Sequence, residues 1–515
     1  MKLGCTRSIV LTGLVAHPVT VEATIGSGLP KTEWTGLPDT AVRESAARVR
    51  SAIESTGGEW PAHKITVGLL PASVRKSGSH YDLAVAVAIL AAQRVLDPTM
   101  VRAIVVLGEL GLDGRVHPVT GVLPAVIGAV RHGLGRVVVP RSNAAEAALV
   151  PGVEVVAVGS LAELCAVLRG EQTEATHDLP AVVPEEEPAL DLADVVGQDE
   201  ARHAIEVAAA GGHHVFLTGP PGVGKTMLAE RLPGLLPDLE GEDALEVTSI
   251  HSLLGRLAPG RPLLRRPPFC APHHSATVAS LVGGGTGVPT PGMISLAHQG
   301  VLFLDEAPEF DRRALDSLRQ PLESGRVTIH RAGGTATYPA RFQLVLAANP
   351  CPCARGGRSA DAASCRCSST QLRAYRNRLS GPLLDRIDLR ARLTPVSRAV
   401  LAAGASGEPT AAVRQRVLEA RARALRRLRA TPWNTNADVP GPDLRRHWPI
   451  PPDALVSLSA DLDRQRLSTR GVDRVMKVAW TLADLAGRDV PHREDVERAR
   501  ALRVLGPTAE LARTA

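Results

Sequence analysis

The first third of the chain alternates short apolar runs with amphipathic stretches. Asp39 is placed to cap a helix that continues to Ile53, and Asp82 to cap a second helix over 83–92. Asp113-Gly114 predicts a type I′ hairpin turn within 110–116. Around these elements, runs rich in β-branched residues have the length of strands: 8–14, 19–24, 65–70, 104–107, 137–139 and 153–158. The pattern predicts an α/β domain over residues 1–170.

The middle of the chain contains apolar runs without polar alternation, at 215–217, 301–304 and 344–348. Such runs are typical of parallel strands that are buried on both faces. A helical pattern follows the first run, so we expect a parallel α/β sheet over 191–392. Residues 171–190 combine prolines with the run Glu185-Glu186-Glu187, and this composition predicts an extended linker.

The last part, 393–515, has helical periodicity. A first helix is expected to contain 413–428, a second helix is expected over 467–479, and a last one begins within 490–496. Seven arginines surround the apolar positions of the first helix, and a solvated face is favoured over a contact with DNA. Those apolar positions have the spacing of one helix face: Val413, Val417, Ala420, Ala424 and Leu428.

Composition narrows the class of protein. A chain of 515 residues is too long for a single core, and 44% hydrophobic with 22% charged residues is typical of a globular protein. No apolar stretch has the length of a membrane span, so we expect a cytoplasmic protein with no membrane contact. The net charge of +6 permits nucleic-acid binding, but 3% aromatic residues argue against a base-stacking platform. Contacts with nucleic acid would go to the backbone, through arginine and main-chain N–H groups.

The run at 215–217 leads into a phosphate-binding loop with the pattern G-x-x-x-x-G-K-[ST]. Its glycines let backbone N–H groups surround phosphate oxygens, and the following helix points its positive end at them. Lys225 would reach the β- and γ-phosphates of ATP, and Thr226 would ligate Mg²⁺. The loop residues are Gly219, Pro220, Pro221, Gly222, Val223, Gly224, Lys225 and Thr226.

The run at 301–304 ends in two carboxylates. Asp305 would hold Mg²⁺ through its water shell, and Glu306 would orient and polarise the attacking water. Because phosphoryl transfer depends mostly on positioning and charge neutralisation, these two residues and Lys225 predict a Mg²⁺-dependent ATP hydrolase.

Four of the seven cysteines cluster after residue 350 with the spacing C-x-C-x11-C-x-C. Four thiolates suit tetrahedral Zn²⁺, although C-x-C is tighter than the usual spacing. We expect zinc, with a reduced flexible loop as the alternative. The cysteines are Cys351, Cys353, Cys365 and Cys367.

Residues 36–45, 81–86 and 108–114, together with the motifs above, resemble the ComM/YifB family of magnesium-chelatase-like AAA+ ATPases. The resemblance covers nearly the whole chain. It implies a Lon-protease-like (ribosomal S5 domain 2-like) α+β N-terminal domain, a P-loop NTPase AAA+ doubly wound parallel sheet, and an all-helical lid. The catalytic serine of a Lon protease falls on His80, beside Ser79, and the lysine falls on Leu123. Since leucine cannot take a proton, we expect a structural or docking role for this domain.

The same resemblance implies further residues of the ATP site. Asn349 would act as sensor 1, with a turn residue as the alternative. Arg386 would act in trans as an arginine finger, with a local pair to Asp385 or Asp388 as the alternative. Arg470 would contact the γ-phosphate as sensor 2, and Arg474 is the alternate candidate. Val196 and Gly197 would flank the adenine or simply precede a helix.

A trans-acting finger implies a ring, and we expect a homohexamer. The resemblance implies DNA as the substrate, in branch migration or unwinding during recombination of incoming DNA. The His273–His274 pair is not expected to bind metal, and the glycines at 283–287 are expected to form a mobile pore loop, although Cys270 and Ser275 depart from the family's Arg and Thr. The alternatives are a metal-chelatase motor and an ATP-driven protein remodeller.

Overall fold

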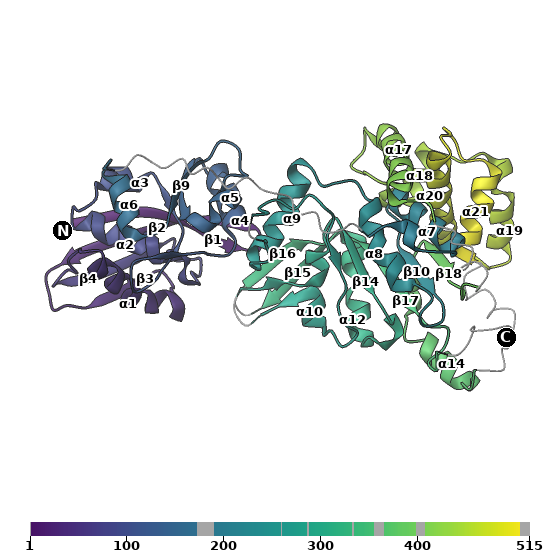
Figure 1. The fold of residues 1–515 in the computed structure, drawn as a ribbon, viewed down its shortest axis with the longest axis horizontal. Coiled ribbons are helices and arrows are strands. Elements are labelled where there is room, and N and C mark those ends of the chain that lie inside the picture. The colour runs from purple at the N-terminus through teal and green to yellow at the C-terminus, as the bar shows by residue number, and fades with distance from the viewer. Residues whose placement is uncertain are drawn as a thin grey trace.

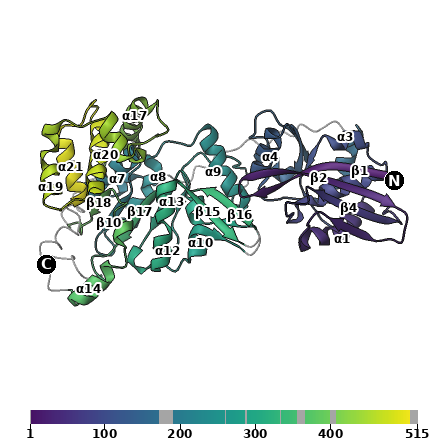
Figure 2. The same ribbon diagram turned by 180° about the vertical axis from the view of Figure 1, so that it is seen from behind.

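The computed structural model describes residues 2–171, 190–258, 260–285, 288–331, 334–354, 365–397 and 407–504. Figures 1 and 2 show an elongated molecule with the N-terminal α/β unit at one end, a central parallel sheet, and a group of helices at the other end. Most of the expected linker, 172–189, lies outside the described residues.

The N-terminal unit is built on a seven-stranded mixed sheet with the order β3-β4-β2-β1-β5-β8-β9. The first two strands are longer than expected, because they pair in antiparallel register along their whole length around a turn at Gly13. Strand β3 was not predicted, and the other strands agree closely with the apolar runs. Their bounds are β1 Lys2–Thr12, β2 Val15–Gly26, β3 Thr32–Thr35, β4 Lys64–Leu70, β5 Val105–Val106, β8 Arg136–Pro140 and β9 Glu154–Val158.

Helix α1 (Thr40–Ser55) begins as predicted, since Asp39 accepts a hydrogen bond from the Val42 N–H at 2.9 Å. The predicted cap at Asp82 is wrong. Asp82 is the first residue of the fully buried helix α2 (Asp82–Ala92), and its carboxylate pairs with the Arg48 guanidinium at 2.6 Å. A buried acid takes a charged partner in preference to a helix end. The remaining helices of the unit are α3 Pro98–Arg102, α4 Val122–Arg131, α5 Ala144–Ala147 and α6 Leu161–Leu168.

The predicted hairpin forms between β6 (Glu109–Leu110) and β7 (Val116–His117). Its turn is not type I′, because Gly114 has a positive φ of 80° and Asp113 does not. The loop is longer than a two-residue turn, and the Gly111 N–H donates to the Arg115 carbonyl at 2.9 Å.

The central sheet has five parallel strands in the order β11-β14-β17-β10-β18. The three predicted apolar strands lie side by side in its middle, with β10 beside β17 and β17 beside β14. Parallel strands end at one edge, so the polar residues that follow them come together there. The bounds are β10 Val215–Thr218, β11 Phe269–Cys270, β14 Val301–Leu304, β17 Gln343–Ala348 and β18 Leu389–Arg392.

Helices and two small hairpins surround this sheet. The expected mobile glycine loop is partly ordered, because Gly283 and Gly284 form β12 and pair with β13 (Thr290–Pro291); residues 286 and 287 lie outside the described range. The second hairpin joins β15 (Arg326–Arg331) to β16 (Gly334–Pro339). The helices are α7 Asp199–Gly211, α8 Lys225–Leu235, α9 Gly241–Leu253, α10 Val278–Val282, α11 Met293–Leu296, α12 Arg312–Ser317, α13 Arg319–Ser324, α14 Ser369–Arg376 and α15 Gly381–Leu384.

The C-terminal part consists of helices that pack on α7, α8 and β18 (Figure 1). They are α17 Thr410–Leu428, α18 Gly441–His447, α19 Val456–Asp463, α20 Thr469–Leu485 and α21 Arg493–Val504. The predicted apolar face of α17 is confirmed, since all five of its residues are buried. No helix of the described ranges is long and apolar enough to cross a membrane.

The predicted solvated arginine face of α17 is only partly confirmed, because Arg426 and, just after the helix, Arg429 are exposed, whereas other arginines of the face are bonded to neighbouring helices. Arg416 pairs with Glu206 at 2.7 Å, Arg427 pairs with Asp484 at 2.6 Å, and Arg421 donates to the Ala209 carbonyl at 2.7 Å. These arginines attach α17 to α7 and to α20, so they are structural cross-links between helices.

Candidate nucleotide-binding site

The phosphate loop connects the end of β10 to the start of α8. Gly222 and Gly224 have φ values of 76° and 95°, which favour glycine because a Cβ is strained there. At Gly219, a Cβ would lie 2.6 Å from the Leu393 carbonyl oxygen, so a side chain has no room. Backbone N–H groups and the positive end of α8 therefore face one concave turn that suits an anion.

Lys225 is buried under this loop. Its Nζ donates to the carbonyl oxygens of Gly219 at 2.7 Å and Pro220 at 3.0 Å, and to Asn349 Oδ1 at 3.0 Å. Burial lowers the pKa of Lys225, and the carboxylates of Asp305 and Glu306 oppose that shift. The lysine is held at the phosphate loop by carbonyls and by the amide that ends β17.

Thr226 and Asp305 meet across the same edge of the sheet. The Thr226 hydroxyl donates to Asp305 Oδ2 at 2.8 Å, although the two residues come from α8 and from the end of β14. A hydroxyl and a carboxylate oxygen are the hard ligands that Mg²⁺ prefers. The donor set therefore fits the predicted magnesium ion.

Glu306 has a φ of 49°, a conformation that non-glycine residues rarely adopt. Its N–H donates to Asp305 Oδ1 at 2.8 Å, and its own carboxylate is exposed. His274 Nδ1 lies 3.6 Å from Glu306 Oε2, whereas His273 Nδ1 contacts Ser275 Oγ at 2.8 Å. The two histidines engage different groups, which disfavours a shared metal ion. Sequence reasoning missed the contact of His274, because nothing local to residue 274 indicates it.

The segment of Val196 and Gly197 lies against the phosphate loop. The next residue, Gln198, donates through Nε2 to the Val223 carbonyl at 3.3 Å and to the Thr394 carbonyl at 2.6 Å. The Thr394 N–H donates back to Gln198 Oε1 at 3.2 Å. Gln198 thus ties this segment to both the loop and the chain beyond β18, a role that the sequence motif did not indicate.

Arg386 is not brought to this group of residues. It is buried, its Nη1 donates to the Pro382 carbonyl at 2.6 Å, and its Nη2 pairs with Glu323 of α13. The local partner is therefore Glu323, and not Asp385 or Asp388 as considered from the sequence.

Arg470 and Arg474 lie on α20 in the lid. Arg470 is exposed at the start of the helix, and Arg474 Nη1 donates to Asp388 Oδ1 at 2.5 Å. Asp388 directly precedes β18, so this pair lies at the amino-terminal edge of the sheet. The phosphate loop follows the carboxyl end of β10, and a strand of four residues spans roughly 13 Å. Arg474 is therefore not placed at the phosphate loop of its own chain.

Known proteins resemble this chain over nearly its whole length. The family model described as magnesium chelatase, subunit ChlI matches residues 191–401, and models of the ChlI subunit and of its C-terminal part match 21–143 and 407–503. A Mycobacterium tuberculosis protein is 52% identical over 506 residues, covering 98% of this chain and 99% of the relative. YifB of Escherichia coli is 40% identical over 98% of both chains, and competence protein ComM of Haemophilus influenzae is 40% identical over 95% of this chain and 94% of the relative.

The chain belongs to the ComM/YifB family of magnesium-chelatase-like AAA+ ATPases. The fold predicted from the sequence is confirmed at this level, with a parallel α/β sheet and a helical C-terminal part. The individual roles of the site residues stay predictions.

The four clustered cysteines of this ComM/YifB member come together although they arise from separate segments. Their sulfur atoms all lie within 4.8 Å of one another. Cys353 Sγ lies 3.3 Å from Cys351 Sγ and 3.8 Å from Cys365 Sγ. Four thiolates around zinc at 2.3 Å would be separated by roughly 3.8 Å, so the cluster fits a tetrahedral zinc ion.

The residues of the N-terminal unit that align with the catalytic positions of a Lon protease make structural contacts. His80 Nε2 lies 3.1 Å from the Ile9 carbonyl, and burial lowers its pKa to about 4. Ser79 Oγ donates to Glu109, and the nearby Lys76 donates to the Pro71 carbonyl. Leu123 is fully buried. No described contact joins a serine to a lysine here.

Leu123 lies at the junction with the ATPase core. Its N–H donates to Glu146 Oε1 at 2.9 Å, and the same carboxylate accepts a hydrogen bond from Ser252 at the end of α9. The Gly121 N–H also donates to the Ser252 carbonyl at 3.0 Å. The loop that would carry the lysine of a Lon protease thus contacts the ATPase core.

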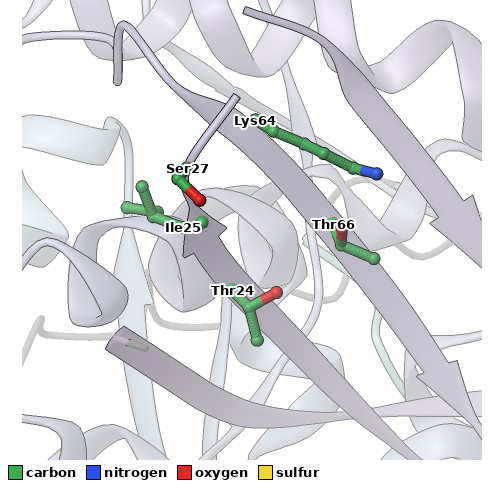
Figure 3. A pocket seen from close by; sticks show the side chains of 6 residues that line it. Thr24, Ile25, Ser27, Lys64 and Thr66 are labelled. Atoms are coloured by element: carbon green, nitrogen blue, oxygen red, sulfur yellow. The ribbon is translucent and has the colours of Figure 1, made fainter. Parts of the chain in front are cut away.

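A hollow of about 480 Å³ lies at the far end of the N-terminal sheet (Figure 3). Its lining side chains come from β2, β4 and the turn after β2, and they include Thr24, Ser27, Lys64 and Thr66. Its titratable side chain, Lys64, is paired with Glu33 at 2.8 Å, and the other lining residues are not titratable.

Proposed function

We propose that this protein is a ring-forming, Mg²⁺-dependent ATPase whose active site is completed by the neighbouring subunit. The observation that carries the proposal is that the predicted site residues of one chain lie in two separate places. At the carboxyl edge of the sheet, Lys225 is hydrogen-bonded to Asn349, and Thr226 is hydrogen-bonded to Asp305. Arg386 is held elsewhere, by Pro382 and Glu323. An arginine finger in this position would serve the site of a neighbouring subunit.

Some of these residues bind ATP, and others activate the attacking water. When ATP is bound, Lys225 exchanges its carbonyl partners for phosphate oxygens, which are the stronger acceptors. Glu306 orients the attacking water and draws on its proton, and Asn349 hydrogen-bonds that water or the γ-phosphate. Thr226 and Asp305 would hold Mg²⁺, whose charge offsets the charge that develops on the phosphate oxygens. Val196 and Gly197 flank the adenine.

Mixed rings test the shared site. Arg386→Ala subunits keep a working phosphate loop, and Lys225→Ala subunits keep a working finger. Each alone is expected to lose hydrolysis, about 10³-fold or more for the finger. A mixture of the two is expected to recover part of the activity, because some interfaces then combine both intact halves. Absence of recovery would show that Arg386 does not act in trans.

The ring is proposed to be a homohexamer that acts on DNA. The net charge of +6 and the relative named competence protein ComM support this substrate. The bonded arginines of α17 do not support it, so the proposed contact is the exposed segment 277–280 beside the His273–His274 pair. Branch migration or unwinding is the proposed activity.

ATP turnover measured side by side with forked, four-way and single-stranded DNA tests this substrate. We expect stimulation at low salt, where contacts with phosphates are strongest, and a loss of stimulation as salt rises. Unchanged turnover with every DNA at low salt would rule the substrate out.

A metal-chelatase motor is the less favoured alternative. The ChlI subunit of Euglena gracilis is 25% identical over only 32% of this chain, whereas YifB and ComM match nearly all of it. A protein remodeller is the other alternative, and Leu123 at the lysine position of a Lon protease argues against proteolysis by it. A cytoplasmic location stays a prediction.

Zinc is proposed to bind at the four cysteines, where it would link the end of β17 to α14. Metal analysis of the purified protein is expected to find about one zinc per chain, as four thiolates in a tetrahedral site require. Cys353→Ser should lower this content, while Cys165→Ser, which changes a buried cysteine outside the cluster, should not. Far less than one zinc per chain in the unmodified protein would rule out the site.

A further inference from the structure

The short segment that carries Arg386 is attached to the lid at two points. Arg503 of α21 donates through Nη1 to the Ile387 carbonyl at 2.5 Å. Arg474 of α20 donates through Nη1 to Asp388 Oδ1 at 2.5 Å. Two lid helices therefore hold the two residues that directly follow the proposed finger.

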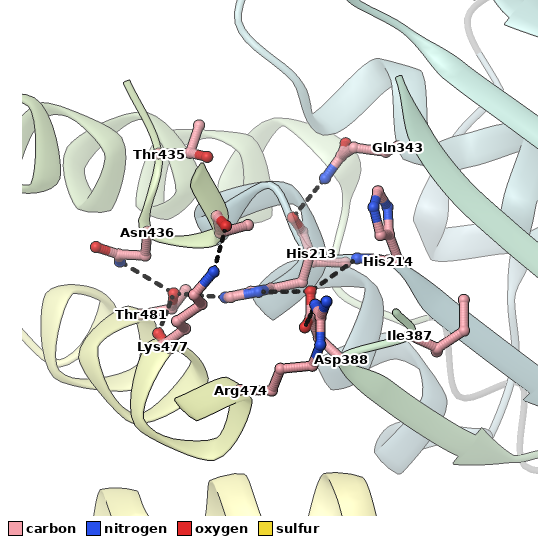
Figure 4. Close-up of polar contacts among 12 residues, drawn as sticks. His213, His214, Gln343, Ile387, Asp388, Thr435, Asn436, Arg474, Lys477 and Thr481 are labelled. Atoms are coloured by element: carbon pink, nitrogen blue, oxygen red, sulfur yellow. Dashed lines mark hydrogen bonds and ion pairs between the residues drawn. The ribbon is translucent and has the colours of Figure 1, made fainter. Parts of the chain in front are cut away.

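Asp388 connects this segment to the central sheet as well. Its carboxylate is buried, and its second oxygen lies 3.3 Å from His213 Nδ1 and accepts from the His214 N–H at 3.4 Å (Figure 4). The Asp388 N–H donates to the His214 carbonyl at 3.1 Å. A buried carboxylate requires partners of this kind, so its position is fixed jointly by the lid and by the start of β10.

A second polar path links the same place to the lid. His213 Nε2 lies 2.8 Å from Thr481 Oγ1 of α20, and Asn436 Nδ2 donates to that hydroxyl at 3.0 Å. Figure 4 shows these side chains converging between α20 and the strands. Because α20 carries both Arg474 and Thr481, a rotation of this helix would move Arg474, a direct partner of Asp388, and Thr481, a partner of His213.

Arg386 itself is held from the other side. Its guanidinium pairs with Glu323 of α13 in the core, while the backbone that follows it is bonded to the lid. The segment that carries Arg386 therefore contacts both the ATPase core and the lid. The position of Arg386 depends on how the core and the lid are oriented relative to each other.

We infer that Asp388 is a positioning residue that couples the orientation of the lid to the placement of Arg386 at the neighbouring subunit's ATP. This inference rests on the proposed function, because it needs Arg386 to act in trans. It assigns to the Arg474–Asp388 pair a task other than direct contact with nucleotide.

Arg474→Gln tests the inference against a matched control. The control is Arg488→Gln, which removes a lid arginine from a pair with the buried Asp495, beyond the end of α20 and outside the polar paths to Asp388. We expect Arg474→Gln to lower kcat about 10²-fold, the effect of a small misplacement of a reacting group, with the Kd for ATP unchanged. Arg488→Gln is expected to keep kcat near that of the unmodified protein. Arg474→Lys, which retains the charge, should recover part of kcat.

Mixed rings and a double variant separate positioning from contact. Arg474→Gln subunits mixed with Lys225→Ala subunits should recover activity as Arg386→Ala subunits do. Asp388→Asn should lower kcat as Arg474→Gln does, and combining the two should cost no more than either alone.

Three outcomes would overturn the inference. If Arg474→Gln lowers kcat but Asp388→Asn does not, Arg474 acts on the nucleotide itself. An equal loss in Arg488→Gln would show that the effect reflects only the integrity of the lid. Unchanged kcat in Arg474→Gln would leave the pair without a role in turnover. By contrast, an unmodified protein that does not hydrolyse ATP would overturn the proposed function itself, and the inference with it.

Discussion

Two buried lysines show how the N-terminal unit and the ATPase core differ. Lys76 donates to the Pro71 carbonyl, and Lys225 donates to the carbonyls of Gly219 and Pro220. Burial lowers the pKa of both. Lys225, however, also contacts Asn349 and lies near Asp305 and Glu306, so it belongs to a group of residues that can bind and activate a ligand.

The same contrast holds for the residues around them. In the core, Thr226, Asp305 and Asn349 are bonded to one another or to Lys225 at a sheet edge. In the N-terminal unit, His80 contacts a backbone carbonyl and Leu123 is buried at the junction. A polar residue whose partners are main-chain groups is part of the packing. Polar side chains that contact one another at an accessible edge of the sheet remain able to bind and activate a ligand.

The largest expected effect comes from Glu306→Gln in the core. The amide keeps the shape of the side chain but cannot draw a proton from water, so kcat should fall about 10²–10⁴-fold while ATP binding persists. Steady-state turnover and equilibrium binding of ATP measure the two effects. Glu309→Gln, three residues away and paired with Arg378, is the control and should keep kcat. Turnover within tenfold of the unmodified protein would remove the role of Glu306.

The local parts of this site follow from the sequence. The phosphate loop and the strands β10, β14 and β17 each consist of one contiguous stretch of sequence. The polar residues that follow these strands meet because parallel strands end at one edge of the sheet. The Thr226–Asp305 contact is a consequence of that rule.

Contacts between distant segments do not follow in the same way. The partner of Arg386 is Glu323, and that of Glu146 is Ser252, 106 positions away. Any of several acids near Arg386 would satisfy the same sequence pattern. The arginines of α17 were expected to face solvent for a similar reason, since periodicity identifies the face of a helix but not the acids that lie opposite it.

The next effect concerns the pH dependence of the N-terminal unit. The pKa of His80 is about 4 in the folded protein and ordinarily 6.5, so the unfolded chain binds the extra proton between these values. Stability from neutral His80 is therefore complete above pH 6.5 and lost as pH falls toward 4, by up to about 3 kcal/mol. His80→Asn should flatten this dependence.

Hydrogen exchange of β1 and α2, followed from pH 7 to pH 4, measures the effect within this unit. His214 in the core has the same lowered pKa, so His214→Asn is a control that should leave the exchange of β1 and α2 unchanged. An unchanged slope in His80→Asn would show that the pKa of His80 is the same in the folded and unfolded chain, and would place it among groups that retain acid–base chemistry.

A smaller effect is expected from Glu146→Gln at the junction. Glu146 Oε2 accepts from Asn143 Nδ2 at 3.1 Å, and Asn143 is fixed by two bonds to the Val119 backbone. The substituted amide would place a donor against that donor, at a cost of about 1–3 kcal/mol. Hydrogen exchange of α4 and α9 should rise together, while Glu154→Gln, at an exposed pair with Arg136, should change neither. Faster exchange in α4 alone would mean that the junction does not depend on Glu146.

The smallest effect is expected from Ser79→Ala. The hydroxyl donates to Glu109, and no described contact links it to a lysine or histidine base. A serine without a lysine or histidine partner is a weak nucleophile, so we expect no peptide hydrolysis by the unmodified protein, and removal of this oxygen should leave ATP turnover unchanged. A casein digest followed with and without ATP, for the unmodified protein and the variant, checks both. A peptidase activity that disappears in Ser79→Ala would show that the N-terminal unit has kept chemistry of its own, and the contrast between the two regions would fail.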